Sequence, residues 1–195
     1  MFRYFAVIFS VLLLSCDPAS VTIEPKPEPE VEEVLEFEDC SQNLDAHPCN
    51  FSLLNQHGDL VELYDFYGKV IIVDFSAMWC GPCVSMAQAA DPIVDEYGAE
   101  NLEWLTVIIE DEQATPPDQD DVLRWATANG ISGHVLAGDR SLIATDAELK
   151  SGYPISGWPT FVVIDEEMVL RHGVRGWSES ILRQILDSMI ESEDG

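Results

Sequence analysis

Basic residues are scarce in this sequence, which has 9 lysines and arginines against 36 aspartates and glutamates and a formal net charge of −27. Proteins that bind nucleic acids neutralise phosphates with lysine and arginine side chains, and this composition does not supply them. The same charge repels anionic membrane surfaces. We therefore expect no nucleic-acid partner, and any attachment to a membrane has to come from a lipid rather than from electrostatic attraction.

Long apolar runs are also missing. The run from Phe5 to Leu14 is shorter than the about 20 residues that a membrane-spanning helix needs, and it fits the core of a signal peptide. Its end, Leu13-Leu14-Ser15-Cys16, resembles the lipobox of bacterial lipoproteins. We expect residues 1–15 to be a lipoprotein signal peptide and Cys16 to carry the lipid. An ordinary signal peptide and an uncleaved anchor are the alternatives.

Residues 16–38 lack the apolar side chains that a core requires, because they alternate proline with glutamate and then add further acids. Proline and charge repulsion extend such a chain, so this segment is predicted to be a semi-rigid tether. Residues 39–195 are enough for one hydrophobic core. We expect them to form a single domain and the protein to be a monomer.

Cysteine is used sparingly, and two of the five cysteines are close together in Trp79-Cys80-Gly81-Pro82-Cys83. This motif follows a β-branched run, Val70 to Phe75, that is typical of a strand buried on both faces. Proline is favoured in the first turn of a helix, so a helix is predicted to begin inside the motif. Zinc needs four ligands, and the sequence offers no second pair at a suitable spacing. The motif therefore indicates a redox-active dithiol, with a plain structural disulfide as the alternative.

Cys80 lies at the predicted start of the helix, where unpaired N–H groups and the helix dipole favour a thiolate over a thiol. Cys83 is one helical turn further along, on the same side. We assign nucleophilic attack to Cys80 and resolution of the mixed disulfide to Cys83. This chemistry requires no cofactor beyond the dithiol itself.

The stretch from Val73 to Cys83 resembles the active-site strand and turn of thioredoxins, and Trp158-Pro159-Thr160 resembles the cis-proline loop of that family. With the lipobox, the chain resembles the membrane-anchored TlpA/ResA-like thiol:disulfide oxidoreductases. The resemblance implies an α/β thioredoxin-like fold, with a central mixed β-sheet flanked by helices and an N-terminal β-hairpin extension.

The same resemblance implies how a substrate binds. Pro159 is expected to lie against the dithiol, to keep metals out and to expose the backbone of Trp158, which pairs with a strand of the substrate. Trp79 and Trp158 are expected to flank the cysteines with apolar surface. Packing in the core is the alternative role for both tryptophans.

Asp74 places a carboxyl group inside an apolar strand, which is costly unless the group is paired or protonated. Thioredoxins carry a buried acid at this distance before the first cysteine. The resemblance implies that Asp74 is a general base that takes the proton of Cys83, and burial is expected to raise its pKa. An inert, hydrogen-bonded aspartate is the alternative.

Cys40 and Cys49 enclose a short loop just before the first apolar segment of the domain. In an exported protein we expect them to form a structural disulfide. Two free thiols are the alternative. A metal site that also uses His47 lacks a visible fourth ligand, so no metal is expected.

Two helices are predicted from their apolar stripes. The helix that follows the dithiol contains Pro92, which predicts a kink or an end near Ala90. The C-terminal helix is predicted to begin after Ser178, and its stripe ends at Ile190. We expect it to pack on the sheet face opposite the active-site helix.

Together these features predict a thiol–disulfide oxidoreductase of the bacterial cell envelope that faces the periplasm and is anchored by lipid, with Asp17 favouring the inner membrane. The Gly-Pro pair between the thiols resembles reducing thioredoxins, so we expect a reductant of protein disulfides that receives electrons from a membrane donor. General disulfide reduction and cytochrome c maturation both fit. The alternatives are a metal or heme-delivery chaperone that uses the dithiol as ligands, and a peroxiredoxin-like peroxidase, whose Pro-x-x-x-Thr-x-x-Cys pattern is absent.

Overall fold

The computed structural model of the protein describes residues 35–146, 148–150 and 152–190. The predicted signal peptide, Cys16 and most of the predicted tether lie outside the described residues. Within the described part of the chain, none of the helices has the length and hydrophobicity needed to cross a membrane.

A five-stranded mixed sheet forms the centre of the domain, with the strand order β5-β4-β3-β6-β7. The strands are β3 (Val70–Ala77), β4 (Leu102–Glu110), β5 (His134–Ala137), β6 (Thr160–Ile164) and β7 (Leu170–Arg175). β3 pairs in parallel with β4 and antiparallel with β6. All residues of β3 are buried, which explains why its sequence is apolar on both faces.

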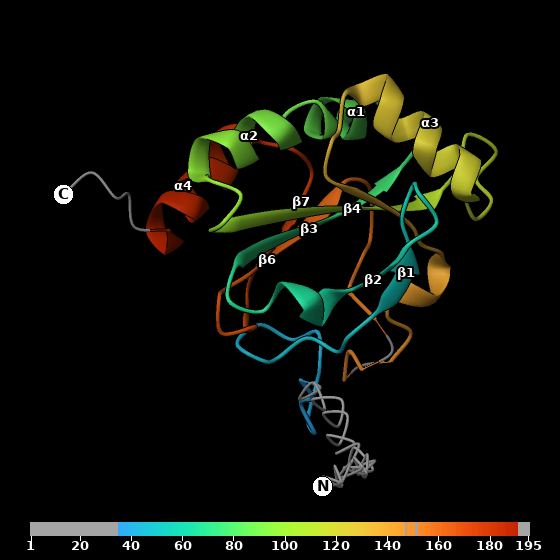
Figure 1. Ribbon diagram of the computed structural model, residues 1–195. Helices are drawn as coiled ribbons and strands as arrows, with labels where there is room; N and C mark the ends of the chain where they lie inside the picture. Colours follow the sequence, from blue (N-terminus) through green and yellow to red (C-terminus); the bar gives the residue numbers. More distant parts are fainter. Residues whose placement is uncertain (1–34, 147, 151, 191–195) are drawn as a thin grey trace, which may run out of the picture. The chain divides into compact units, whose positions relative to one another are not determined.

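The helices cover one face of this sheet (Figure 1). They are α1 (Gly81–Ala87), α2 (Ala90–Tyr97), α3 (Gln119–Asn129) and α4 (Glu179–Met189). α1 and α2 are separated by Gln88 and Ala89, near the predicted position. Pro92 has no N–H to bond the carbonyl of Gln88, so the helix breaks one turn before the proline.

The prediction that the C-terminal helix packs opposite the active-site helix is wrong. Leu182 and Leu186 of α4 lie in the same hydrophobic cluster as Met86 of α1 and Ile93 of α2. The apolar stripe identifies the side of α4 that packs. It does not say which face of the sheet receives that side, because both faces of β3 are apolar.

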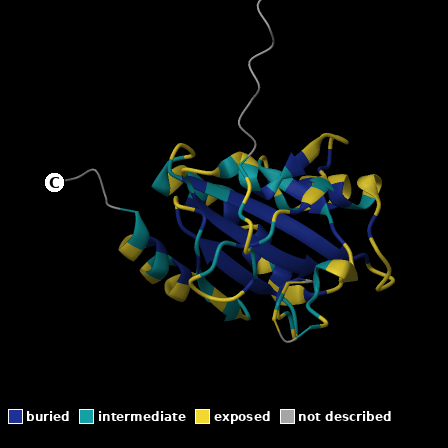
Figure 2. Ribbon diagram, turned by 90° about the horizontal axis from the view of Figure 1, so that it is seen from below, coloured by how far each residue is buried: buried dark blue, intermediate teal, exposed yellow. Residues whose placement is uncertain are grey.

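The other face of the sheet is covered by the N-terminal part of the domain. β1 (Ser52–Leu54) and β2 (Leu60–Glu62) form the predicted antiparallel hairpin, and the short 3-10 helix η1 (Leu63–Phe66) follows. Phe51 and Leu63 pack in one cluster with Phe75 of β3. Figure 2, which views the domain from below, shows the strands as a buried layer.

Several chain segments meet at the carboxyl end of β3 because of the strand directions. β4 is parallel to β3 and ends at Glu110, the register partner of Ala77. β6 is antiparallel and begins at Thr160, which is paired with Phe75 on one side and Arg175 on the other. The dithiol motif, the end of β4, the loop before β6 and the end of β7 therefore lie along one edge of the sheet.

Candidate active site

The dithiol sits where β3 passes into α1. Cys80 is the N-cap residue of α1, and its Sγ accepts a hydrogen bond from the backbone N–H of Cys83 at 3.3 Å. Pro82 occupies the first turn, where its missing N–H costs no helical hydrogen bond. The two cysteines are joined by a disulfide. Cys80 is 5% exposed and Cys83 is completely buried.

The two sulfurs differ in their exposure to solvent and in their surroundings. The N–H groups at the start of a helix favour a negative charge, so the position of Cys80 suits a thiolate once the disulfide is reduced. Cys83 has no access to solvent, so a substrate sulfur can reach only Cys80. The geometry thus allows attack by Cys80 followed by displacement by Cys83.

The loop before β6 lies beside the dithiol. The Trp158–Pro159 peptide bond is cis. Pro159 is buried, and its carbonyl accepts a hydrogen bond of 2.7 Å from the N–H of Gly176 at the end of β7. Trp158 packs against the hydrophobic cluster that contains Cys80 and Cys83, and also against the cluster on the hairpin side of the sheet. The structure therefore brings Trp158 and the cysteines together.

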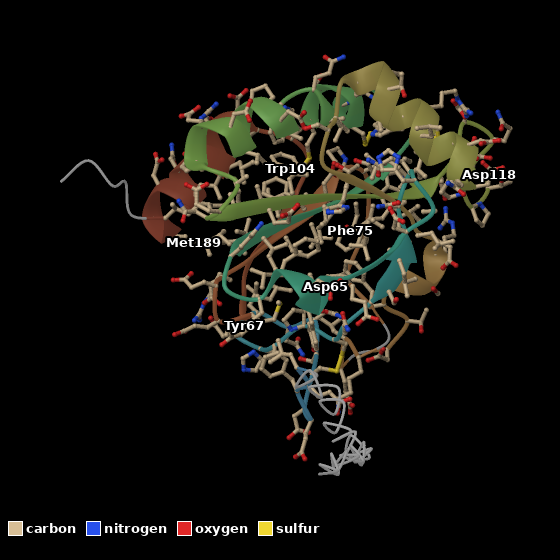
Figure 3. The ribbon with its side chains drawn as sticks, in the orientation of Figure 1. Asp65, Tyr67, Phe75, Trp104, Asp118 and Met189 are labelled. Carbon is tan, nitrogen blue, oxygen red and sulfur yellow. A yellow bond between two sulfur atoms is a disulfide. The ribbon has the colours of Figure 1, made fainter. Side chains whose placement is uncertain are left out.

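Asp74 lies in the middle of β3 and is completely buried. Its neighbours Val73 and Phe75 belong to the cluster on the hairpin side, so Asp74 points to the side of the helices. Figure 3 shows Phe75 on the hairpin side and Trp104 on the helix side. Burial raises the pKa of Asp74 from 3.8 to about 7, against a hydrogen bond of 2.7 Å from the Ser76 hydroxyl, which lowers it. Asp74 is thus poised to exchange a proton near neutral pH.

A polar network that was not predicted from the sequence lies next to the dithiol. The buried carboxylate of Glu110, at the end of β4, accepts a hydrogen bond of 2.9 Å from the indole N–H of Trp79. Its other oxygen accepts from the guanidinium of Arg140. The network fixes the indole of Trp79, which is 52% exposed beside Cys80, so this tryptophan is not a core residue. The sequence contains one signal for this network. Glu110 ends the apolar run of β4, and an acid beside an apolar run marks a functional candidate in the same way as Asp74 does in β3.

Cys40 and Cys49 lie away from this edge and form a second disulfide. The loop between them is closed by a hydrogen bond from the Ser41 N–H to the His47 carbonyl at 2.9 Å. The His47 ring stacks on Phe37 and its Nδ1 is 2.8 Å from the carbonyl of Met168. Within the described residues, no three histidine, cysteine or acidic side chains are grouped as metal ligands.

The sequence model described as the AhpC/TSA family matches residues 45–173, which is more than half of the 195 residues. The chain belongs to the AhpC/TSA family. The span shared with the AhpC/TSA family includes Asp74, the dithiol and the cis-proline loop. It begins after Cys40 and ends before α4.

Other similarities of this AhpC/TSA family member lie with thioredoxins. It is 40% identical over 43 residues to a thioredoxin of Coprinus comatus, a match that covers 22% of this chain and 41% of that protein. The chain thus spans less than half the length of the curated relatives that it matches.

Two solved structures cover far more of the chain. A thiol:disulfide interchange protein of the thioredoxin family from Chlorobium tepidum TLS is 20% identical, with a TM-score of 0.59, over 79% of this chain and 99% of that one. An exposed lipoprotein thioredoxin of Streptococcus pneumoniae strain TIGR4 is 25% identical, with a TM-score of 0.57, over 72% and 99%. The predicted thioredoxin-like fold is confirmed.

Proposed function

We propose that the protein is a lipid-anchored thiol–disulfide oxidoreductase that faces the periplasm and reduces disulfide bonds in other proteins. The observation that carries this proposal is the Cys80–Cys83 disulfide at the start of α1, with the cis Pro159 loop beside it and Asp74 buried on the helix side of β3. The similarity to thioredoxins and to a thiol:disulfide interchange protein supports it.

The reaction transfers two electrons in two displacements. The Cys80 thiolate attacks one sulfur of the substrate disulfide, a mixed disulfide forms, and the other substrate sulfur leaves as a thiolate that takes a proton. Cys83 then loses its proton to the carboxylate of Asp74 and attacks Cys80 Sγ. The second substrate thiolate leaves, and the Cys80–Cys83 disulfide remains. A membrane electron donor has to return the two electrons before the next turnover.

Substrate binding in this proposal uses the surface around the dithiol. Trp79 offers an exposed indole beside Cys80, held by Glu110. The backbone of Trp158, next to the cis-proline, pairs with an extended stretch of the substrate chain. We propose protein disulfides as the substrate class, with the heme-site disulfides of apocytochromes c as one member.

The direction of electron flow is testable through the reduction potential of the Cys80–Cys83 couple. With Gly81 and Pro82 between the thiols, as in reducing thioredoxins, we expect a potential near the about −270 mV of thioredoxin, and turnover of insulin with dithiothreitol as donor. Equilibration with glutathione buffers, followed by alkylation and mass spectrometry, measures the potential. A value near the about −120 mV of strong oxidants contradicts the proposed reductant role.

The proposed location rests on Cys16, and the lipoprotein name of the pneumococcal structure supports it. We expect the mature protein to begin at Cys16 and to carry acyl chains there. Mass spectrometry of the N-terminal peptide from membrane fractions tests this, with Cys16→Ser as the control that loses the lipid. An unmodified cysteine on the mature chain contradicts the anchor without affecting the redox assignment.

A peroxidase is disfavoured by the residues around Cys80. The peroxiredoxin pattern requires threonine three residues and proline seven residues before the reactive cysteine. Ala77 and Val73 occupy these positions, and both side chains are buried and apolar. They supply no hydroxyl to hold a peroxide beside Cys80.

A further inference from the structure

A second buried polar side chain lies next to Asp74. Thr106 of β4 is the register partner of Asp74, and both residues are completely buried. The neighbours of Thr106 along β4, Leu105 and Val107, belong to the cluster on the hairpin side. Thr106 therefore points to the helix side of the sheet, as Asp74 does.

These two side chains each have an unused polar atom. Asp74 Oδ1 accepts the hydrogen bond of Ser76, but among the described residues neither Asp74 Oδ2 nor Thr106 Oγ1 has a partner. Buried polar atoms are nearly always hydrogen-bonded in folded proteins. A carboxylate only accepts hydrogen bonds, a protonated carboxyl also donates, and a hydroxyl does both. A threonine hydroxyl can therefore complement Asp74 in either protonation state.

Among the buried side chains of the described residues, no other ionisable group competes for this role near Asp74. Its partner on β6 is Phe161, and the buried residues that α2 and α4 pack onto this face are apolar. α1 adds Cys83, whose thiol appears on reduction, and α3 adds apolar residues. The remaining buried carboxylates of the described chain, Glu110, Asp111 and Asp165, lie at or beyond strand ends.

We infer that Thr106 is a positioning residue for proton transfer by Asp74. Thr106 Oγ1 and Asp74 Oδ2 are not hydrogen-bonded in this structure, so the Thr106 hydroxyl donates to Oδ2 of the ionised carboxylate through one water molecule or after a change of the Thr106 rotamer. When the proton of the Cys83 thiol moves to Asp74 Oδ2, the hydroxyl turns and accepts from the new O–H. The exchange consumes no other reactant. The inference rests on the proposed function only for the source of the proton.

The titration of the Asp74 carboxyl in the oxidised, full-length protein tests this inference without any substrate. Carbon-13 NMR of labelled aspartate follows the carboxyl, and Asp74→Asn identifies its signal. We expect Thr106→Val to raise the midpoint of the Asp74 titration by about one pH unit. The lost hydrogen bond stabilises the ionised carboxylate more than it stabilises the protonated carboxyl. Thr106→Ser keeps the hydroxyl and is expected to keep the midpoint. A Thr106→Val midpoint equal to that of the wild type overturns the inference.

A second measurement separates positioning from a structural effect. Thr106→Ala also removes the hydroxyl and adds no apolar volume, so it serves where valine disturbs folding, with the same expected shift. In an Asp74→Asn background, we expect removal of the hydroxyl to leave the pH profile of insulin reduction unchanged. If it alters that profile equally with and without Asp74, Thr106 acts on structure alone and the inference is wrong. Absence of insulin reduction in the wild type would reject the proposed function and leave the carboxyl titration informative.

Discussion

Cys80→Ser is expected to reduce the rate of insulin reduction to that of the reaction without enzyme, a loss of at least about a thousandfold. A serine hydroxyl is not ionised near neutral pH and does not attack a disulfide. Cys83 cannot take over, because its side chain is completely buried. Turbidity from precipitating insulin chains, with dithiothreitol as electron donor, measures the rate.

Cys83→Ala is the matched control, since it leaves Cys80 and the start of α1 in place. This variant is expected to attack normally and then stall as a mixed disulfide, which non-reducing gels and mass spectrometry detect. The trapped protein identifies the natural substrate. Turnover by Cys80→Ser at the wild-type rate would reject the redox assignment.

Asp74→Asn is expected to make the protein slower and more stable at the same time. Burial raises the pKa of Asp74 from 3.8 to about 7, so the folded protein holds this proton more tightly than the unfolded chain does. The contribution of Asp74 to the free energy of unfolding is therefore fully present below pH 4 and is lost as the pH rises through 7. At about 1.4 kcal/mol per pKa unit, the ionised carboxylate lowers the free energy of unfolding by on the order of 4 kcal/mol at pH 8.

Asparagine removes this cost because it has no charge to bury. Urea unfolding of the oxidised proteins is expected to show Asp74→Asn more stable than wild type by about 2–4 kcal/mol at pH 8, with the difference vanishing near pH 4. The rate of disulfide reduction at pH 8 is expected to fall by about tenfold or more, since the proposed general base is lost. Equal stability differences at both pH values would contradict a buried, titrating Asp74.

The sequence predicts the parts of the site that depend on neighbours along the chain. Three of these parts are local: the dithiol, the helix that begins inside it, and the acid in the middle of β3. A strand followed by a Gly-Pro turn allows the backbone few other conformations. The resemblance to thioredoxins adds Pro159, which lies far along the chain. These residues are also the ones that the structure brings to one edge of the sheet or onto its helix side.

The features that the sequence did not predict depend on the register between strands. Thr106 and Asp74 become neighbours only when β3 and β4 align, and Glu110 reaches Trp79 for the same reason. The residue pattern of one strand does not specify how that strand aligns with its neighbour. The face chosen by α4 was mispredicted because amphipathicity describes one helix and says nothing of which neighbours it joins.

The Cys40–Cys49 disulfide also has a mechanical consequence. A pull from the N-terminal side that reaches Cys40 passes through the sulfurs straight to Cys49, next to β1. The disulfide is a covalent path around the loop of residues 41–48, so this loop cannot be drawn out of the domain.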